Sequence, residues 1–394
     1  ADDVMIKRGH NGGNVTVNGT YNSTLNLGGT VGMLGFKANT TIMTGITNSG
    51  TVTIGKDITV DDIFYCGGLS ARVAVGNNLE PNIVNSGAVV VEGGEFKGTA
   101  YIGGAYGWTD KAVKDIHNNG TVTINGGTFS GAQLNIAGAI GYVDKGVSKI
   151  YNTGNVTLNN CTIAGNPAIA GGIGIVAKKT TVSYVENSGA VTLNGIKATN
   201  TTSTSSSVGG CVALFTNEYG GAATYYTNTG AITLDKDCSI NTQLMVAGCV
   251  AKHNKQDGGA FTDLTNNAPI KIYADTNSNI YVGGVAGYVY PSATSRRLLN
   301  DVNGDITLDV TKTSNYTESV KIMIAGVAGQ LRCHSVPLEN RGDIYIGGKI
   351  QATIGVSGVI TQPNNMDRTD LTNSGNITID AVIDGDCRVG GIEM

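Results

Sequence analysis

Residues 11–17 read Asn11-Gly12-Gly13-Asn14-Val15-Thr16-Val17, and related phrases follow this one to give eleven copies along the chain. A second phrase alternates with the first, and its clearest copy is Val282-Gly283-Gly284-Val285-Ala286-Gly287. One full cycle of the two phrases takes roughly 36 residues. A regular repeat of this length indicates a solenoid, because each unit can bury its apolar face only against the next unit.

The apolar part of the first phrase predicts a strand. Two apolar residues flank one polar residue, so a strand turns both apolar side chains to the same face. The first inward position is β-branched and aliphatic in every copy. It is occupied by Val15, Val52, Val89, Val122, Val156, Val191, Ile232, Ile270, Ile306, Ile344 and Ile377. This column predicts a stacked aliphatic ladder, in which each fully buried member contributes roughly 1.5–3 kcal/mol.

The polar and small residues between the strands predict corners. Asn and Gly tolerate positive φ, so we expect a corner at each copy of the motif Asn48-Ser49-Gly50. A second polar column, which includes Asn125 and Asn159, predicts amide ladders that support the next corner. The Gly-Gly phrase predicts a strand whose backbone lies close to a neighbouring wall. The Ser- and Thr-rich residues 199–207 predict a loop.

These patterns predict an all-β fold, a single-domain parallel β-solenoid, or β-helix, of about eleven coils with right-handed winding. The repeat covers residues 1–394 with no break in composition, so we expect one domain. The sequence stops within a unit, after Val389-Gly390-Gly391-Ile392. An open rung is a template for association, so we expect the solenoid to continue, or to be capped, beyond residue 394 in a parent protein.

Composition argues against several classes of partner. The formal net charge of -4 comes without a basic stripe, so we expect no nucleic acid partner. No apolar run reaches the ~18 residues of a membrane span, so no transmembrane segment is expected. The seven cysteines include no Cys-x-x-Cys pair, and the four histidines lie in different units. We therefore expect buried free thiols and neither a metal nor a cofactor. A disulfide between Cys211 and Cys249 in adjacent units would need distorted geometry.

The alternation of Gly-Gly-Val-x-Gly with Asn-x-Gly-x-Val/Ile-Thr resembles the GLUG-type repeats and related Gly- and Asn-rich β-solenoid repeats of bacterial surface proteins. Such repeats occur in large adhesins and in cell-surface proteins of Bacteroidota. The resemblance covers nearly all of the chain and rests on coil-forming residues. It implies an extracellular rod that is associated with the cell surface, from which a signal peptide has been removed. It supplies no active-site residues.

Two aromatic residues are the candidate ligand site. Trp108 and Tyr142 each lie four residues after the second-phrase glycine in adjacent units, and Phe36 and Tyr288 occupy the same position elsewhere. Rings one rung apart can form a platform on which sugar rings stack. The alternative is that these rings cover the core beneath a loop. An outward row of threonines, including Thr123, leaves ice binding as a minor alternative.

Residues for catalysis are sparse. The acidic pairs Asp61-Asp62, Asp235-Lys236-Asp237 and Asp384-Gly385-Asp386 lie at different offsets within their units, so they do not predict a common groove. The tripeptide Arg341-Gly342-Asp343 falls in the repeat frame, where Gly342 is the corner glycine. We therefore expect no catalytic residues and no enzyme.

The sequence thus predicts a non-enzymatic, structural or adhesin-like solenoid that presents loops to surface glycans or proteins. Self-association of the chain would fit a stalk, filament or surface coat. A first alternative is an accessory surface component of an outer-membrane nutrient-import complex, which would hold a membrane partner through one wall. A second alternative is a polysaccharide-active β-helix enzyme, which would need a carboxylate groove.

Overall fold

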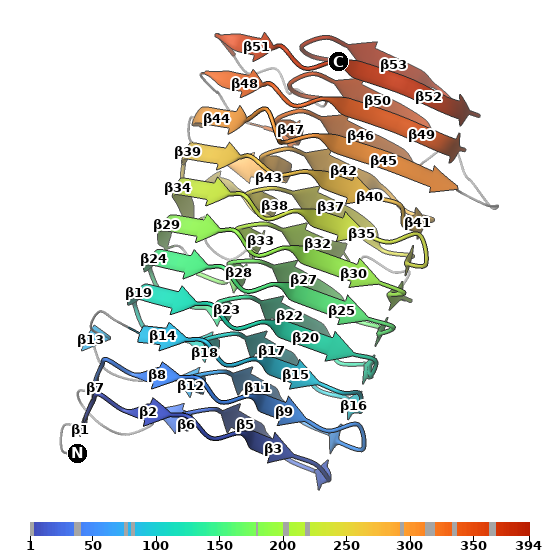
Figure 1. Cartoon of the computed structure of the whole chain (residues 1–394). Helices are drawn as coiled ribbons and strands as arrows, with labels where there is room; N and C mark the ends of the chain where they lie inside the picture. Colours follow the sequence, from blue (N-terminus) through green and yellow to red (C-terminus); the bar gives the residue numbers. More distant parts are fainter. Residues whose placement is uncertain are drawn as a thin grey trace.

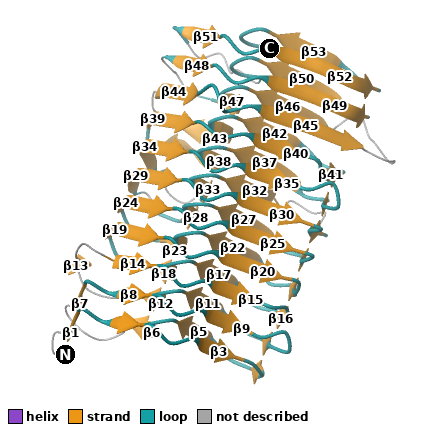
Figure 2. Cartoon of the chain, in the orientation of Figure 1, coloured by secondary structure: helices purple, strands orange, loops and turns teal. Residues whose placement is uncertain are grey.

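The computed structural model describes residues 4–34, 41–74, 78–79, 83–178, 180–199, 205–216, 221–291, 295–311, 320–332, 337–361 and 368–394. These residues form a parallel β-solenoid, with strands and turns and no helix (Figures 1 and 2). The coils stack along one axis from the N-terminus to the C-terminus. The predicted all-β solenoid is therefore confirmed.

A complete coil passes through five walls in the same order, and each wall is one parallel sheet. Wall 1 contains β2 (His10–Asn11), β8 (Thr47–Asn48), β14 (Ile83–Asn85), β19 (Val113–Asn118), β24 (Val147–Asn152), β29 (Thr181–Asn187), β34 (Ala222–Asn228), β39 (Phe261–Asn266), β44 (Arg296–Asn300), β48 (Leu338–Asn340) and β51 (Leu371–Asn373). Wall 2 contains β3 (Val15–Val17), β9 (Val52–Ile54), β15 (Val89–Val91), β20 (Val122–Asn125), β25 (Val156–Asn159), β30 (Val191–Asn194), β35 (Ile232–Leu234), β40 (Ile270–Ile272), β45 (Ile306–Thr311), β49 (Ile344–Ile350) and β52 (Ile377–Ile383).

The chain then enters the short wall 3, which contains β4 (Thr20–Tyr21), β10 (Thr59–Val60), β16 (Glu95–Phe96), β21 (Thr128–Phe129), β26 (Thr162–Ile163), β31 (Lys197–Ala198), β36 (Ser239–Ile240) and β41 (Asp275–Thr276). Wall 4 contains β5 (Leu25–Gly28), β11 (Phe64–Gly67), β17 (Ala100–Gly103), β22 (Gln133–Ala137), β27 (Asn166–Ala170), β32 (Ser205–Gly209), β37 (Gln243–Ala247), β42 (Ile280–Gly283), β46 (Lys321–Ala325), β50 (Thr353–Ser357) and β53 (Cys387–Gly390).

Wall 5 completes the coil with β6 (Val31–Leu34), β12 (Ser70–Val73), β18 (Tyr106–Thr109), β23 (Ile140–Val143), β28 (Ile173–Val176), β33 (Val212–Phe215), β38 (Val250–Gly258), β43 (Ala286–Pro291) and β47 (Ala328–Leu331). A separate three-stranded sheet pairs β1 (Val4–Lys7), β7 (Thr41–Thr44) and β13 (Asn78–Leu79).

The number of coils differs slightly from the prediction. Walls 1, 2 and 4 each have 11 strands, whereas wall 5 has 9. After β47, single bridges from Ala328 to Ile360 and from Ile360 to Glu393 continue wall 5. About nine turns therefore carry a strand on all four long walls, against the eleven that the repeats suggested.

Two hydrophobic cores run the length of the solenoid. The first lies between walls 2, 3 and 4, and the aliphatic ladder faces it; in this ladder Val122 pairs with Val156 and Val156 pairs with Val191. Val52 to Ile344 in the ladder are fully buried, and the end members Val15 and Ile377 are half-buried. The second core lies between walls 5 and 1. The cross-section therefore has two lobes.

An asparagine ladder separates the two lobes. The last residue of every wall 1 strand is an asparagine, and from Asn48 to Asn340 these side chains are buried. Each Nδ2 donates to the Oδ1 of the asparagine in the next coil at 2.7–2.9 Å. The second glycine of the Gly-Gly phrase lies against this ladder: a Cβ on Gly68 would meet Asn85 Oδ1 at 2.6 Å. The asparagines of the first sequence phrase and the glycines of the second thus pack against each other between the two cores, and we call this contact the waist.

The predicted reason for the Asn-x-Gly motif was wrong. None of the asparagines and glycines of this motif in the described residues has a positive φ. The asparagine is needed for its buried amide. The glycine is needed because a Cβ at Gly87 would collide with the carbonyl oxygen of Gly50 in the preceding coil. The second polar column does form an amide ladder, since Asn159 donates to Asn125 at 2.9 Å.

Two smaller predictions concern single segments. Residues 199–207 were expected to form a loop, but Ser205–Gly209 is strand β32, and Ser206 Oγ lies 2.6 Å from Thr242 Oγ1 inside the protein. The hydroxyls pair with one another, so a polar run can be buried. Residues 200–204 lie outside the described residues. The described cysteines are free thiols, buried except for Cys387, and Cys333 lies outside this part of the chain.

Candidate functional site

The outward faces of walls 4 and 5 are folded against each other. The first glycine of each Gly-Gly phrase sits in a sharp turn, where a Cβ at Gly103 would collide with the carbonyl oxygen of Tyr106. Beyond the turn, a Cβ at Gly107 would lie 2.7 Å from the carbonyl oxygen of Cys66 in wall 4. We call this contact the seam. Its side chains are buried although they point away from both cores; Tyr65 and Tyr281 are 6% exposed.

The two predicted site residues lie in the seam. Trp108 pairs in register with Tyr142, with ring centroids 6.3 Å apart and planes at 16°. Both residues are half-buried. Tyr65 meets Trp108 edge-on at 6.3 Å, and Tyr101 meets Tyr142 edge-on at 5.1 Å. The rings therefore interlock with tyrosines of wall 4.

A cation also covers Trp108. The Arg72 guanidinium carbon lies 4.5 Å from the Trp108 ring centroid, in the coil before it. A sugar that stacked on this ring face would have to displace Arg72, which is a favourable cation–π partner. Burial raises the pKa of Tyr101 to about 12. A glycan role for Trp108 and Tyr142 stays a prediction.

The partners of these rings were missed in the sequence. The residues of wall 4 that alternate with the core positions, such as Tyr65 and Tyr101, were not singled out in the sequence. Tyr288 repeats the arrangement further along, edge-on to Tyr281 at 4.9 Å. Phe36 lies outside the described residues. A recurrent aromatic residue two positions before the Gly-Gly pair was the available signal.

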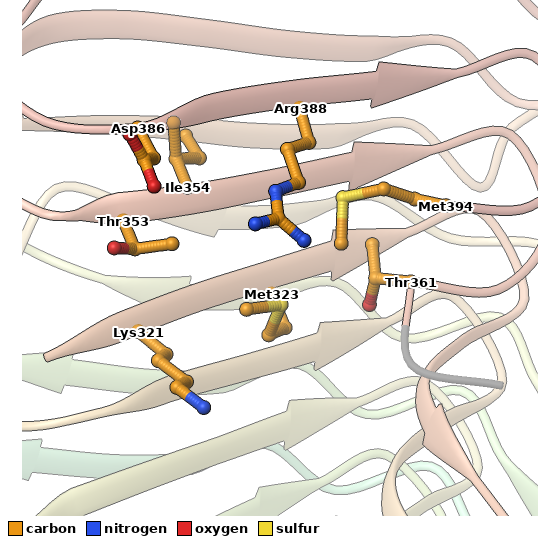
Figure 3. A pocket seen from close by; sticks show the side chains of 8 residues that line it. All are labelled: Lys321, Met323, Thr353, Ile354, Thr361, Asp386, Arg388 and Met394. Carbon is orange, nitrogen blue, oxygen red and sulfur yellow. The ribbon is translucent and has the colours of Figure 1, made fainter. Parts of the chain in front are cut away.

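The seam opens into a hollow near its C-terminal end. At Gly355 the outward side chain is missing, and a Cβ there would lie 2.7 Å from Met394 Sδ and 2.9 Å from Met323 Sδ. The hollow has a volume of about 380 Å³. Its lining residues are Lys321, Met323, Thr353, Ile354, Thr361, Asp386, Arg388 and Met394 (Figure 3). We call it the Gly355 hollow.

Wall 1 carries a repeated backbone irregularity. The residue three positions before the ladder asparagine has a φ between 54° and 60° in nine coils. These residues are Arg8, Gly45, Asp115, Lys149, Tyr184, Tyr225, Asp263, Arg297 and Asp370. The pairing register skips this position, since Ser183 pairs with Thr224 and Val185 pairs with Tyr226. Each of these coils thus has a one-residue break in the strand alternation of wall 1, in register with its neighbours, which adds one outward side chain.

Two tyrosines occupy this strained position in adjacent coils. Tyr184 and Tyr225 are 45% and 47% exposed, and their rings stack at 4.7 Å and 15°. A bulky residue in the left-handed region is uncommon and costs on the order of 1 kcal/mol or more. Apolar burial does not explain the choice of tyrosine here, because the rings are exposed. Because the left-handed conformation recurs in nine coils, it belongs to the repeat, and the pair of half-exposed rings is what distinguishes these two coils.

A hollow of about 210 Å³ lies beside the tyrosine pair on wall 1. It is lined by Tyr151, Glu186 and Thr227 from the position just before the ladder asparagine, and by Thr153, Ser188 and Thr229 from the position just after it. Burial, followed by the charges of Glu186 and Asp115, raises the pKa of Tyr151. We call Tyr151, Tyr184, Glu186, Tyr225 and Thr227 the tyrosine strip.

A pair of interacting polar side chains lies on each side of the strip. Towards the N-terminus, His117 stacks on Tyr151 at 4.6 Å and lies 3.3 Å from Asp115 Oδ1. Towards the C-terminus, Arg297 forms an ion pair with Asp263, and its hydrogen bond holds the pKa of Asp263 below the ordinary value. Arg297 and Asp263 neutralise one another, and the strip between the two flanking pairs is aromatic and hydroxyl-rich apart from Glu186.

The charged residues of the acidic motifs and of the Arg-Gly-Asp tripeptide form ion pairs and hydrogen bonds at separate places along the solenoid. Lys97 Nζ lies 2.9 Å from Asp61 Oδ1, and the Arg341 side chain binds Glu339 and Asp301. Asp343 accepts a hydrogen bond from the backbone N–H of Asn376. The structure brings none of these described motifs into the tyrosine strip.

The described ranges carry neither a metal-binding cluster nor a membrane-spanning helix. There, no group of three or more His, Cys, Asp and Glu side chains is arranged to hold a metal ion. No helix in the described part has the length and apolar character to cross a membrane. No family model, curated protein or solved structure matches the chain. The two hollows, with the tyrosine strip beside one of them, are therefore the candidate functional sites.

Proposed function

We propose that this chain is a non-enzymatic β-solenoid of a bacterial cell surface, of the GLUG-like type suggested by its repeats, and that its tyrosine strip binds neutral glycans. The observation that carries the proposal is the exposed Tyr184–Tyr225 pair, held on left-handed backbone beside a hydroxyl-lined hollow. The left-handed conformation recurs in nine coils, so the support for a ligand comes from the choice of two half-exposed, stacked tyrosines at this position in adjacent coils.

The strip has the chemistry that a sugar requires. Tyrosine rings contact the C–H faces and edges of sugars, and their hydroxyls donate and accept hydrogen bonds. Glu186 and Thr227 add acceptors and a donor at the floor of the hollow. Glu186 is the single acidic side chain among the described residues that line it, and no cation lines it. A neutral glycan therefore fits better than an anionic one.

The hollows support binding over hydrolysis. Hydrolysis of a glycoside ordinarily uses two carboxyl groups, roughly 5–9.5 Å apart, on either side of the scissile bond. The wall 1 hollow has Glu186 and the Gly355 hollow has Asp386 as the one acidic group among their described lining residues. Turnover of any polysaccharide by the purified protein would overturn the non-enzymatic part of the proposal.

The binding test is affinity electrophoresis of the purified chain through gels that contain single neutral polysaccharides. We expect retardation in at least one gel, and loss of it in Tyr184→Ala and in Tyr225→Ala. The matched control is Tyr345→Ala, because Tyr345 is 37% exposed on wall 2, away from the strip. Retardation that survives both strip substitutions, or that the control abolishes equally, contradicts the proposal.

Surface location and partners need a cellular test. Crosslinking on intact source cells, followed by capture of this protein and mass spectrometry, should recover surface glycoconjugates or copies of the chain. Recovery of an outer-membrane transporter in fixed stoichiometry would instead support the importer accessory. If a membrane-impermeant label does not react with the protein on intact cells, the extracellular location is contradicted.

A further inference from the structure

The Gly355 hollow combines charges with an apolar floor. Lys321, Thr353 and Asp386 lie in one column, because Lys321 pairs with Thr353 and the residue after Asp386 pairs with Ile354. Arg388 pairs with Gly355, two positions further along the strands and therefore on the same face. The column that is filled by Tyr281 and Met323 in earlier coils thus has no side chain of its own at Gly355, where Met323 and Met394 pack, and it continues as a cation at Arg388.

The charged side chains of the hollow are not used to stabilise the fold. Within the described part of the chain, Lys321, Asp386 and Arg388 form no ion pair with one another or with other residues. Figure 3 shows the Arg388 guanidinium in the centre of the lining, between Thr353 and Met394. Elsewhere on the solenoid, arginines such as Arg297 and Arg341 are paired with carboxylates.

We propose that the Gly355 hollow binds one carboxylated sugar unit of an anionic polysaccharide. Arginine matches a carboxylate with two parallel hydrogen bonds, and Lys321 adds a second positive charge. Asp386 and Thr353 supply acceptors for sugar hydroxyls. The thioethers of Met323 and Met394 adapt to the apolar face of a sugar ring. This proposal is independent of the tyrosine strip, which lies on a different wall.

The balance of charge selects the ligand. Two cations and one carboxylate leave a local charge of one positive unit, which suits one carboxylate and disfavours a dense polyanion. The volume of about 380 Å³ lies within the range of small-molecule sites. A bare inorganic anion would leave the methionine floor and Asp386 without a role. A sugar with one carboxyl group and several hydroxyls uses every group of the lining.

The test is titration calorimetry of the full chain at low salt with a hyaluronan hexasaccharide, in which a neutral sugar separates the carboxylates. The control ligand is the same hexasaccharide with its carboxyl groups methyl-esterified. We expect the free acid to bind and the ester to bind at least roughly tenfold more weakly, because a hydrogen bond to a charged group is lost. Equal binding of acid and ester overturns the proposal.

Three variants locate the site. Arg388→Gln should weaken binding roughly tenfold or more, and Gly355→Ala should weaken it by pushing the methionines into the hollow. The matched control Arg296→Gln removes an exposed arginine of wall 1 and should leave the affinity unchanged. An unchanged affinity in Arg388→Gln and Gly355→Ala, with unchanged melting temperatures, overturns the proposal, as does an equal loss in Arg296→Gln.

Two further measurements separate this site from its rivals. An acidic peptide of the same net charge should bind more weakly than the hexasaccharide, and equal affinity would assign the hollow to peptides instead. Tyr184→Ala should leave hexasaccharide binding intact, since that residue belongs to the proposed neutral-glycan site. A loss in Tyr184→Ala would mean that the two sites are not independent and would overturn this inference alone.

Discussion

The seam and the tyrosine strip both contain stacked tyrosines, but those of the seam are largely buried and those of the strip are about half-exposed. In the seam, Tyr65 and Tyr101 stack at 5.0 Å and 7°, and Tyr65 is 6% exposed. On the strip, Tyr184 and Tyr225 stack at 4.7 Å and 15°, and Tyr184 is 45% exposed. The rung spacing of a parallel sheet, ~4.8 Å, imposes this stacking in both places. Ring stacking in a solenoid is therefore no evidence of function by itself.

Exposure and backbone conformation separate the two regions. The seam rings gain apolar burial on ordinary strand backbone, so stability explains them. Tyr184 and Tyr225 of the strip remain about half-exposed and sit on left-handed backbone, so they gain less from burial than the seam rings do. Removing seam residues should therefore damage the fold, whereas removing strip residues should damage binding.

The largest effect is expected from closing the seam with a bulky residue. A Cβ at Gly141 would lie 2.6 Å from the carbonyl oxygen of Gly107 and 3.0 Å from the backbone nitrogen of Ile102. Gly141→Val should cost roughly 3 kcal/mol or more, because walls 4 and 5 must separate. Gly141→Ala should cost less, since Ala71 and Ala213 occupy the same position in other coils. Urea unfolding curves for both variants measure the difference.

The next largest effect contrasts one ring from each region. Trp108→Ala should cost roughly 2–3 kcal/mol, because it removes a half-buried ring and leaves a cavity in the seam. Tyr184→Ala should change stability by less than about 0.5 kcal/mol. The same urea experiment checks both, and similar losses in the two variants would erase the distinction between seam and strip.

A lysine in the seam should respond to pH. Burial lowers the pKa of Lys252 to about 8, while its Nζ donates to Ser205 Oγ at 2.6 Å. Below pH 8 the folded protein bears the cost of a charged, desolvated ammonium, and that cost disappears as the pH rises towards the unfolded value near 10.4. Lys252→Met should therefore stabilise by about 1–2 kcal/mol at pH 7.

The control for Lys252 is a lysine on the exposed side of the molecule. Lys149→Met alters an exposed residue of wall 1, so its effect on stability should be small and nearly independent of pH. Melting curves between pH 7 and pH 10 should show the benefit of Lys252→Met shrinking with rising pH. A benefit that stays constant across this range would contradict the assigned cause.

The smallest effect concerns strain on the strip. Tyr184 has a φ of 55°, a region that glycine enters without penalty. Tyr184→Gly should be more stable than Tyr184→Ala by about 0.5–1 kcal/mol, which reverses the usual order of these two residues in a strand. The matched pair at Glu186, which has no positive φ, should show the usual order. Differential scanning calorimetry resolves both pairs.

The architecture could be read from the sequence because its signals are local and repeated. The alternation in Val122-Thr123-Ile124 assigns inward and outward positions, and this places the aliphatic ladder in the first core. The reason for the Asn-x-Gly motif was misread, although a signal existed. In Ile116-His117-Asn118 the asparagine has the same parity as the buried isoleucine, which places its amide inside.

The candidate site was harder to predict, for two physical reasons. The left-handed residue in each wall 1 coil breaks the strand alternation, so inward apolar residues such as Val182 and Val185 are three positions apart instead of two. This spacing recurs in β19, β24, β34 and β39 and was a usable signal. The seam, by contrast, is a contact between walls 4 and 5, and its local signal, an aromatic residue two positions before the Gly-Gly pair, does not show which wall covers that ring. Trp108 therefore looked like a surface platform, although it packs beneath Arg72.

The asparagine ladder also gives the solenoid a direction. Each Nδ2 gives one hydrogen to the next coil and the other to the backbone carbonyl of its own turn, as Asn118 does with Gly120 at 2.7 Å. The turn fixes the orientation of every amide, so all these dipoles point the same way along the axis. Reversing a single amide would set oxygen against oxygen on one side and hydrogen against hydrogen on the other. The asparagine ladder is thus a chain of aligned amide dipoles in which one amide cannot be reversed alone. Its dipole makes the two ends of the solenoid electrostatically different.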